Sequence, residues 1–172
     1  AIDKPAALRM GVSVGNTLNA FTIPVSETTI GYMLSFIRAL PFMDDTMREG
    51  VWNKPPITTI SECTVGIVGV GNIGQALVRR LRAFGCRILV NDTAPIKPDF
   101  LIENRIEAVT LPELLAQSDI VTMHTDLNPT SRHLINRDTL ALMKPNAILI
   151  NTSRGPVVDE AALVDALENG SI

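Results

Sequence analysis

Three glycines at short, fixed intervals lie between an apolar run and a helical pattern. Gly69, Gly71 and Gly74 form the pattern G-x-G-x-x-G directly after an apolar run and before a helical pattern. The first glycine permits a tight turn, the second lets a diphosphate approach the backbone, and the third lets helix and strand pack closely. Unpaired N–H groups at the start of the helix then face the phosphates. The pattern therefore predicts a diphosphate site at this turn.

Asp92 stands at the end of the next strand pattern, about 18 residues after Gly74. A carboxylate at that place accepts hydrogen bonds from ribose hydroxyl groups and repels a 2′-phosphate. We therefore expect NAD, rather than NADP, as the cofactor. The alternative is a glycine turn that binds nothing, which the surrounding strand, helix and acid disfavour.

Arg154 is the residue that could take part in chemistry, and it follows the apolar strand pattern 147–151 together with Thr152 and Ser153. A guanidinium can hold a carboxylate through two parallel hydrogen bonds and polarise a neighbouring carbonyl group. We expect Arg154 to hold a small 2-oxo or 2-hydroxy acid at the nicotinamide end of the site. A surface arginine in an ion pair is the alternative.

Neither histidine is placed as a proton donor. His124 ends the apolar pattern 119–124, so we expect a partly buried imidazole that lines the adenosine side of the site. His133 lies at a junction between loop and helix, where a solvated ring is expected. Reduction of a ketone by hydride needs a proton donor with a pKa near neutrality. No pair of histidine and carboxylate in this sequence is well placed to supply one.

Strand patterns alternate with helical patterns along the chain. This alternation predicts an α/β Rossmann fold, a doubly wound parallel sheet with helices on both faces and the strand order 3-2-1-4-5. We expect a truncated version, with the substrate domain and the final strands missing. The expected strands cover residues 65–70, 87–91, 105–109, 119–124 and 147–151, and a loop with Pro95 and Pro98 is expected before the third.

The first part of the chain has a different character. We interpret residues 1–23 as the remnant of a substrate domain or hinge, with one strand at 10–14, and residues 24–172 as the NAD-binding domain. Ser26 is expected to cap a long helix that Pro41 interrupts. Its apolar stripe, Ile30 to Met43, is expected to be partly core and partly a homodimer interface.

Composition excludes several classes of protein. A hydrophobic share of 46% over 172 residues supports a sizeable core. A net charge of −3 means that the chain has no excess of basic residues with which to bind nucleic acid. No stretch has the length and apolarity of a membrane span. Cys63 and Cys86 lie in apolar patterns and are expected to be reduced thiols of a cytoplasmic protein.

These motifs together resemble the NAD-binding domain of the D-isomer-specific 2-hydroxyacid dehydrogenases, the group with D-3-phosphoglycerate and glycerate/hydroxypyruvate dehydrogenases. The resemblance covers nearly the whole chain. It is carried by V-x-E at 25–27, G-x-G-x-I-G from Gly69, Asp92, D-I-V-x-x-H-x-x-L-x-x-x-[ST] from Asp119, and L-x-x-M-K-P-x-A-I-L-I-N-x-S-R-G from Leu140.

The resemblance implies roles for individual residues. The backbone of Asn72 and Ile73 would face the pyrophosphate, and Thr125 would line the adenosine side. Thr152 and Ser153 would contact the nicotinamide side, and Arg154 would be the catalytic arginine that binds the substrate carboxylate. Asp126 departs from the family, which usually has proline there, so the local backbone is expected to differ from the family's. The family's catalytic histidine and glutamate are expected beyond Ile172.

The function that this resemblance implies is NAD-dependent oxidation or reduction of a D-2-hydroxy acid of the phosphoglycerate or glycerate kind. The chain would bind the cofactor without turning over alone. An NAD-sensing corepressor that binds protein partners is the alternative, and the negative charge and the lack of a peptide-groove motif disfavour it. A purely structural Rossmann module conflicts with the joint presence of the glycines and Asp92.

Overall fold

The computed structural model describes residues 2–17 and 19–172. Its centre is a five-stranded sheet in the order β3-β2-β1-β4-β5, in which every neighbouring pair is parallel. The predicted fold class and strand order are confirmed. The strands are β1 (Thr64–Val68), β2 (Arg87–Asn91), β3 (Glu107–Ala108), β4 (Ile120–Met123) and β5 (Ile148–Asn151).

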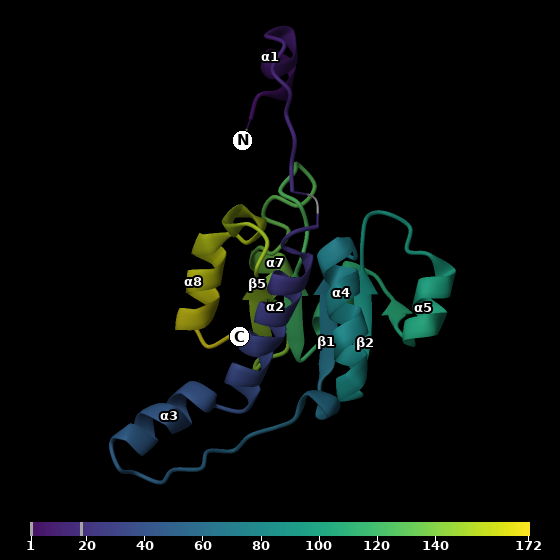
Figure 1. The fold of residues 1–172 in the computed structure, drawn as a ribbon. Coiled ribbons are helices and arrows are strands. Elements are labelled where there is room, and N and C mark those ends of the chain that lie inside the picture. The colour runs from purple at the N-terminus through teal and green to yellow at the C-terminus, as the bar shows by residue number, and fades with distance from the viewer. Residues whose placement is uncertain (1, 18) are drawn as a thin grey trace.

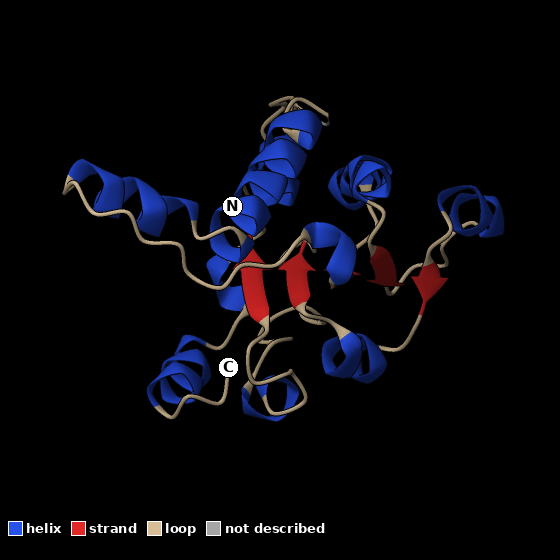
Figure 2. Cartoon of the chain, turned by 90° about the horizontal axis from the view of Figure 1, so that it is seen from below, coloured by secondary structure: helices blue, strands red, loops and turns tan. Residues whose placement is uncertain are grey.

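Helices cover both faces of the sheet, as Figure 2 shows from below. One face carries α2 (Thr22–Ile37), α4 (Asn72–Leu81) and α5 (Pro98–Asn104). The other carries α6 (Leu111–Gln117), α7 (Arg137–Leu140) and α8 (Glu160–Glu168). Parallel strands joined by crossover helices bury both faces of the sheet, which explains why β1 and β4 are almost continuously apolar.

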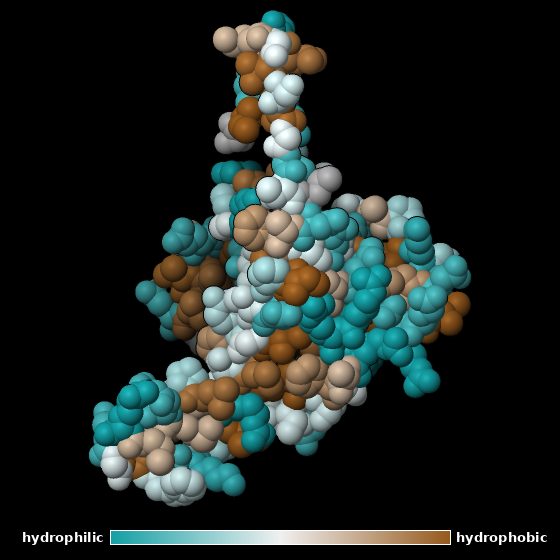
Figure 3. Space-filling model, in the orientation of Figure 1, coloured by the Kyte–Doolittle hydropathy of each residue, from teal (hydrophilic) through white to brown (hydrophobic). Residues whose placement is uncertain are grey.

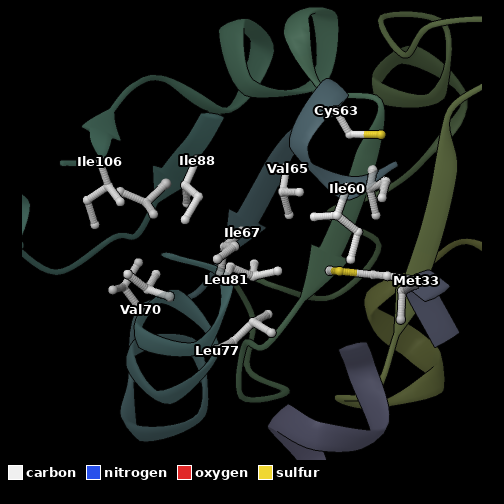
Figure 4. Packing of buried hydrophobic residues seen from close by; sticks show 14 of the residues in the cluster. Met33, Ile60, Cys63, Val65, Ile67, Val70, Leu77, Leu81, Ile88 and Ile106 are labelled. Atoms are coloured by element: carbon white, nitrogen blue, oxygen red, sulfur yellow. The ribbon is translucent and has the colours of Figure 1, made fainter. Parts of the chain in front are cut away.

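The apolar core lies in two layers, one on each side of the sheet. On the α2 and α4 side, Met33 is fully buried and packs in one cluster with Ile60, Ile67 and Leu77. Figure 4 shows these side chains converging between helix and sheet. The opposite layer joins Leu114 and other residues of α6, α7 and α8 to the strands. Packing on both faces therefore fixes the positions of the strand ends, where the polar residues of the connecting loops lie.

The amino ends of the strands are held together by one carboxylate. Asp119 accepts a hydrogen bond from the backbone N–H of Thr64, at 2.7 Å, and an ion-paired hydrogen bond from Lys144 Nζ, also at 2.7 Å. Thr64 begins β1, and Asp119 immediately precedes β4. This contact therefore sets the relative register of the two central strands at the end of the sheet opposite the glycine turn.

Some expectations near the N-terminus are wrong. Residues 10–14 form no strand but an exposed irregular segment after α1 (Lys4–Arg9), which projects from the sheet (Figure 1). A strand needs a partner for its backbone groups, and none lies alongside this segment among residues 2–17 and 19–172. Ser26 lies inside α2 instead of capping it, and its hydroxyl donates to the carbonyl of Ile23. Of the expected remnant 1–23, positions 1 and 18 lie outside the described residues.

The expected interruption near Pro41 is confirmed. Helix α2 ends at Ile37, and α3 (Leu40–Arg48) begins after Ala39, whose φ of 49° lies in the left-handed region. Proline suits the first turn of the new helix because its missing N–H would have no partner there. The break turns α3 away from the sheet (Figure 1).

The segment expected to be a loop before β3 contains a helix, α5, so that part of the prediction is wrong. Pro98 begins this helix at a position that tolerates proline, and the side chain of Phe100 joins the core below Arg79. Proline breaks the interior of a helix but is tolerated in its first turn, and here it starts one.

Apolar side chains remain exposed where α2 passes into α3. Phe36, Leu40 and Phe42 are exposed, with Phe36 at 66%, and Figure 3 shows apolar surface in this region and along α1. Of the expected stripe, Ile30 to Met43, the side chains of Met33 and Ile37 are core and the others are at least partly accessible. No helix among the described residues is long and apolar enough to cross a membrane.

Met33→Ala tests the packing of α2 against the sheet. We expect the free energy of unfolding to fall by about 2–5 kcal/mol, because the substitution leaves a cavity in a fully buried layer. Urea denaturation measures the change. Met47→Ala is the matched control, since Met47 is 55% exposed, and a comparable loss there would contradict the assignment of Met33 to the core.

Candidate functional site

The glycine turn brings β1 and α4 into close contact. Gly69 has a φ of 95°, and a Cβ placed there would lie 2.6 Å from the carbonyl oxygen of His124. A Cβ on Gly74 would lie 2.1 Å from the carbonyl oxygen of Gly69, whereas a Cβ on Gly71 would meet nothing within 4 Å. The turn thus excludes side chains at its first and third glycines and leaves open space beside the second.

A cleft of about 580 Å³ opens at the carboxyl ends of the strands, beside this turn. That volume lies within the range of small-molecule sites. Seven of the predicted site residues line it, namely Gly69, Gly71, Asn72, Ile73, Asp92, His124 and Thr125. Gly74 lies behind the turn, and the predicted residues Thr152, Ser153 and Arg154 are not in the lining of this cleft. The structure therefore brings together the residues expected around the diphosphate and adenosine and leaves the arginine loop outside.

The Asp92 carboxylate is fixed by the backbone around it. One oxygen accepts a hydrogen bond from the N–H of Val70 at 2.6 Å, and the other accepts from the N–H of Ala94 at 2.8 Å. An ionised carboxylate offers about four lone-pair positions, so roughly two remain for other donors. Asp92 therefore stabilises the glycine turn from β2 and still presents acceptor capacity to the cleft.

One buried polar atom in the cleft lining lacks a partner. The Thr125 hydroxyl is inaccessible to solvent and makes no hydrogen bond within the described chain. A buried hydroxyl without a partner costs free energy that a ligand can offset. Together with the open space at Gly71, this orphaned hydroxyl fits a polar ligand such as a dinucleotide beside the turn.

His124 connects the ends of β4 and β5. Its Nε2 lies 3.0 Å from Thr122 Oγ1, and its Nδ1 lies 3.4 Å from Thr152 Oγ1. Burial lowers the pKa of His124 to about 4, so the ring is neutral at physiological pH. The expected partly buried, satisfied imidazole is confirmed. The contact with Thr152 was not predicted, because the histidine and Thr152 are far apart in the sequence.

The loop after β5 is built around Asn151. Its side-chain oxygen accepts hydrogen bonds from the N–H and hydroxyl of Ser153, and its Nδ2 donates to the carbonyl of Arg154. Arg154 is exposed, and its Nη1 donates to the carbonyl of Ser153 at 2.8 Å. No carboxylate among the described residues pairs with this guanidinium, so the expected alternative of an ion pair is not found within this part of the chain.

His133 has a carboxylate nearby but stands apart from the cleft. Its Nδ1 lies 4.0 Å from Asp159 Oδ2, at the cap of α8. The ring is half exposed, as expected, and it does not line the cleft.

One wall of the cleft was missed by the sequence interpretation. Asn16, Phe21 and Thr22 line one side, and Asn19 Oδ1 accepts a hydrogen bond of 2.6 Å from Asn72 Nδ2. These residues carry no motif that indicates a site. The opposite wall is the segment 125–131; its Thr125 was predicted to line the site, whereas Asp126 was noted only as a departure from the family.

The glycine turn, the aspartate at the tip of β2 and a cleft across the carboxyl ends of a doubly wound sheet define the class of Rossmann dinucleotide-binding domains. Residues 30–172 match the family model described as "D-isomer specific 2-hydroxyacid dehydrogenase, NAD binding domain". The chain belongs to this family.

Curated relatives and solved structures agree with that membership. The chain is 39% identical to D-3-phosphoglycerate dehydrogenase of Methanocaldococcus jannaschii and 37% identical to glycerate dehydrogenase of Methylorubrum extorquens. These alignments cover 99% of this chain but 33% and 54% of the relatives, so the chain spans from a third to about half of their length. D-lactate dehydrogenase of Aquifex aeolicus, crystallised with NAD and lactic acid, is 28% identical with a TM-score of 0.89 over 99% of this chain and 52% of that one.

Gly74→Ala tests the contact between α4 and the turn. We expect the free energy of unfolding to fall by about 1–3 kcal/mol, because the added Cβ would lie 2.1 Å from a backbone oxygen that must move. Thermal or urea unfolding gives the value. Gly31→Ala, at an exposed position of α2 where a Cβ meets nothing within 4 Å, should instead stabilise by about 0.5–1 kcal/mol. Equal effects of the two substitutions would refute the close contact.

The buried imidazole predicts a pH dependence of stability. The folded-state pKa of His124, about 4, lies below the unfolded value of about 6.5. The unfolded chain therefore binds the proton first, and stability falls as the pH drops from about 6.5 towards 4. Between pH 7 and pH 5 we expect a loss on the order of 1–2 kcal/mol that His124→Asn removes. Urea titrations of both proteins at the two pH values measure it, and identical pH slopes would contradict the buried neutral ring.

Proposed function

We propose that this chain is the cofactor-binding part of an NAD-dependent oxidoreductase that acts on a D-2-hydroxy acid of the phosphoglycerate or glycerate kind. One observation carries the proposal: Gly69, Gly71 and Asp92 line one cleft at the carboxyl ends of the strands. We assign residues 24–172 to the NAD-binding domain and residues 1–23 to a hinge or substrate-domain remnant. The family membership and the named activities of the relatives support this assignment.

The cleft residues offer contacts along a dinucleotide. The N–H groups of Asn72 and Ile73, at the start of α4, face the diphosphate beside the open position at Gly71. Asp92 accepts hydrogen bonds from the adenosine ribose with its remaining lone pairs. The orphaned Thr125 hydroxyl finds a partner on the adenosine side.

The nicotinamide end lies at the carboxyl end of β5. There His124 holds Thr152 in place from the neighbouring strand, and Thr152 and Ser153 face the nicotinamide. When bound, NAD supplies the hydride acceptor, or in its reduced form the donor. Arg154, free of ion pairs in the described chain, binds the substrate carboxylate. These roles rest on the position of the loop after β5 and on the family membership.

The group that exchanges the substrate proton is proposed to lie outside this chain. His124 has both ring nitrogens near threonine hydroxyls, and its pKa of about 4 is too low for a proton donor at neutral pH. His133 does not line the cleft. We therefore expect the chain alone to bind NAD and not to reduce a 2-oxo acid.

The corepressor alternative gains no support, because the family model and the relatives described above are dehydrogenases by name.

We propose a homodimer through α2 and α3, supported by the exposed side chains of Phe36, Leu40 and Phe42. A cytoplasmic location is proposed on the free thiols of Cys63 and Cys86, which form no disulfide.

Calorimetric titration with NADH and NADPH tests the cofactor assignment. We expect NADH to bind and NADPH to bind at least tenfold more weakly, because a 2′-phosphate would meet the Asp92 carboxylate. Asp92→Asn should weaken NADH binding and narrow the difference between the cofactors. Asp99→Asn, which removes an exposed charge at the start of α5, is the control. Absence of NADH binding, or a preference for NADPH, would overturn the assignment.

A further inference from the structure

The cleft lining contains two carboxylates in different situations. Asp92 and Asp126 are the charged side chains among the described residues that line it. Each oxygen of Asp92 accepts a hydrogen bond from the backbone. The carboxylate of Asp126 is exposed and has no partner in the described chain. Asp126 therefore offers an unused anionic acceptor to whatever occupies the cleft.

The placement of the two acids indicates which part of the cofactor Asp126 meets. Strands β2 and β4 flank β1, so Asp92 and the segment 125–131 stand on opposite sides of the glycine turn. Thr152 and Arg154, which we assign to the nicotinamide end, do not line the cleft. The cleft therefore corresponds to the adenosine half of the cofactor site. If Asp92 holds the ribose, as the proposed function requires, the base attached to that sugar lies against the segment 125–131.

The segment 125–131 holds Asp126 in a fixed position. Ser131, only 4% exposed, donates its hydroxyl hydrogen bond to the carbonyl of Asp126 and accepts one from the N–H of Asn128 at 2.9 Å. Asn128 Oδ1 in turn accepts from the N–H and hydroxyl of Thr130 and from the N–H of Ser131. These groups satisfy one another's hydrogen bonds. The Asp126 carboxylate is therefore the strong hydrogen-bond acceptor on this wall that remains free.

We propose that Asp126 is a specificity-determining residue that accepts a hydrogen bond from the exocyclic amino group of the cofactor's adenine. This inference rests on the proposed function, because it takes NAD as the ligand. An amino group donates to a carboxylate, and such charge-assisted bonds are stronger than neutral ones. Hypoxanthine carries a carbonyl oxygen in place of the amino group, so that Asp126 repels it.

Calorimetry with NADH and reduced nicotinamide hypoxanthine dinucleotide tests the proposal on the 172-residue chain. We expect the hypoxanthine analogue to bind about tenfold more weakly, which corresponds to ~1.4 kcal/mol. Asp126→Leu should bring the two affinities within about twofold of each other, because the leucine neither accepts nor repels. Asp126→Asn, which is nearly isosteric, should do the same, because its amide can accept from an amino group or donate to a carbonyl.

Asp138→Asn is the matched control, since it removes the same charge from an exposed position outside the cleft and should keep the tenfold preference. Equal binding of the two dinucleotides by the unmodified chain, or an unchanged preference in both Asp126 variants, would overturn the role of Asp126 while leaving NAD binding intact. A chain that binds neither dinucleotide would instead refute the proposed function, and the inference with it.

Discussion

The closeness of α4 to the end of β1 is the constraint on which the rest of the structure depends. A Cβ at Gly74 would lie 2.1 Å from the carbonyl of Gly69, so the helix can approach the strand only because this position has no side chain. That approach aims the first turn of α4 at the cleft. Asp92 then holds the turn from β2 through the N–H of Val70.

The two ends of the sheet have separate tasks. At the amino ends, Asp119 joins Thr64 to Lys144 and keeps β1 and β4 in register. At the carboxyl ends, polar loops converge, and His124 links β4 to the loop after β5 through Thr152. Because the imidazole is uncharged near neutral pH, this link keeps the same hydrogen-bonding character across the physiological range.

Sequence patterns predicted the strand order and most of the cleft, because glycine spacing and apolar alternation are local signals. The signals failed where local and tertiary effects compete. Pro98 suggested a loop but starts α5, and the apolar run at 10–14 finds no partner strand in the part of the chain that the structure describes. The wall formed by Asn16, Phe21 and Thr22 carried no motif, since only the fold brings it beside a turn some fifty residues away.

The turn centred on Ser131 has a consequence for the thermodynamics of association. Its backbone and side chains already satisfy one another through Asn128, so it is ordered before any ligand arrives. Ordering a loop on binding costs conformational entropy, roughly 1–2 kcal/mol for each residue fixed. A preorganised wall avoids this cost, so the free energy of each new contact goes into affinity rather than into immobilising the chain.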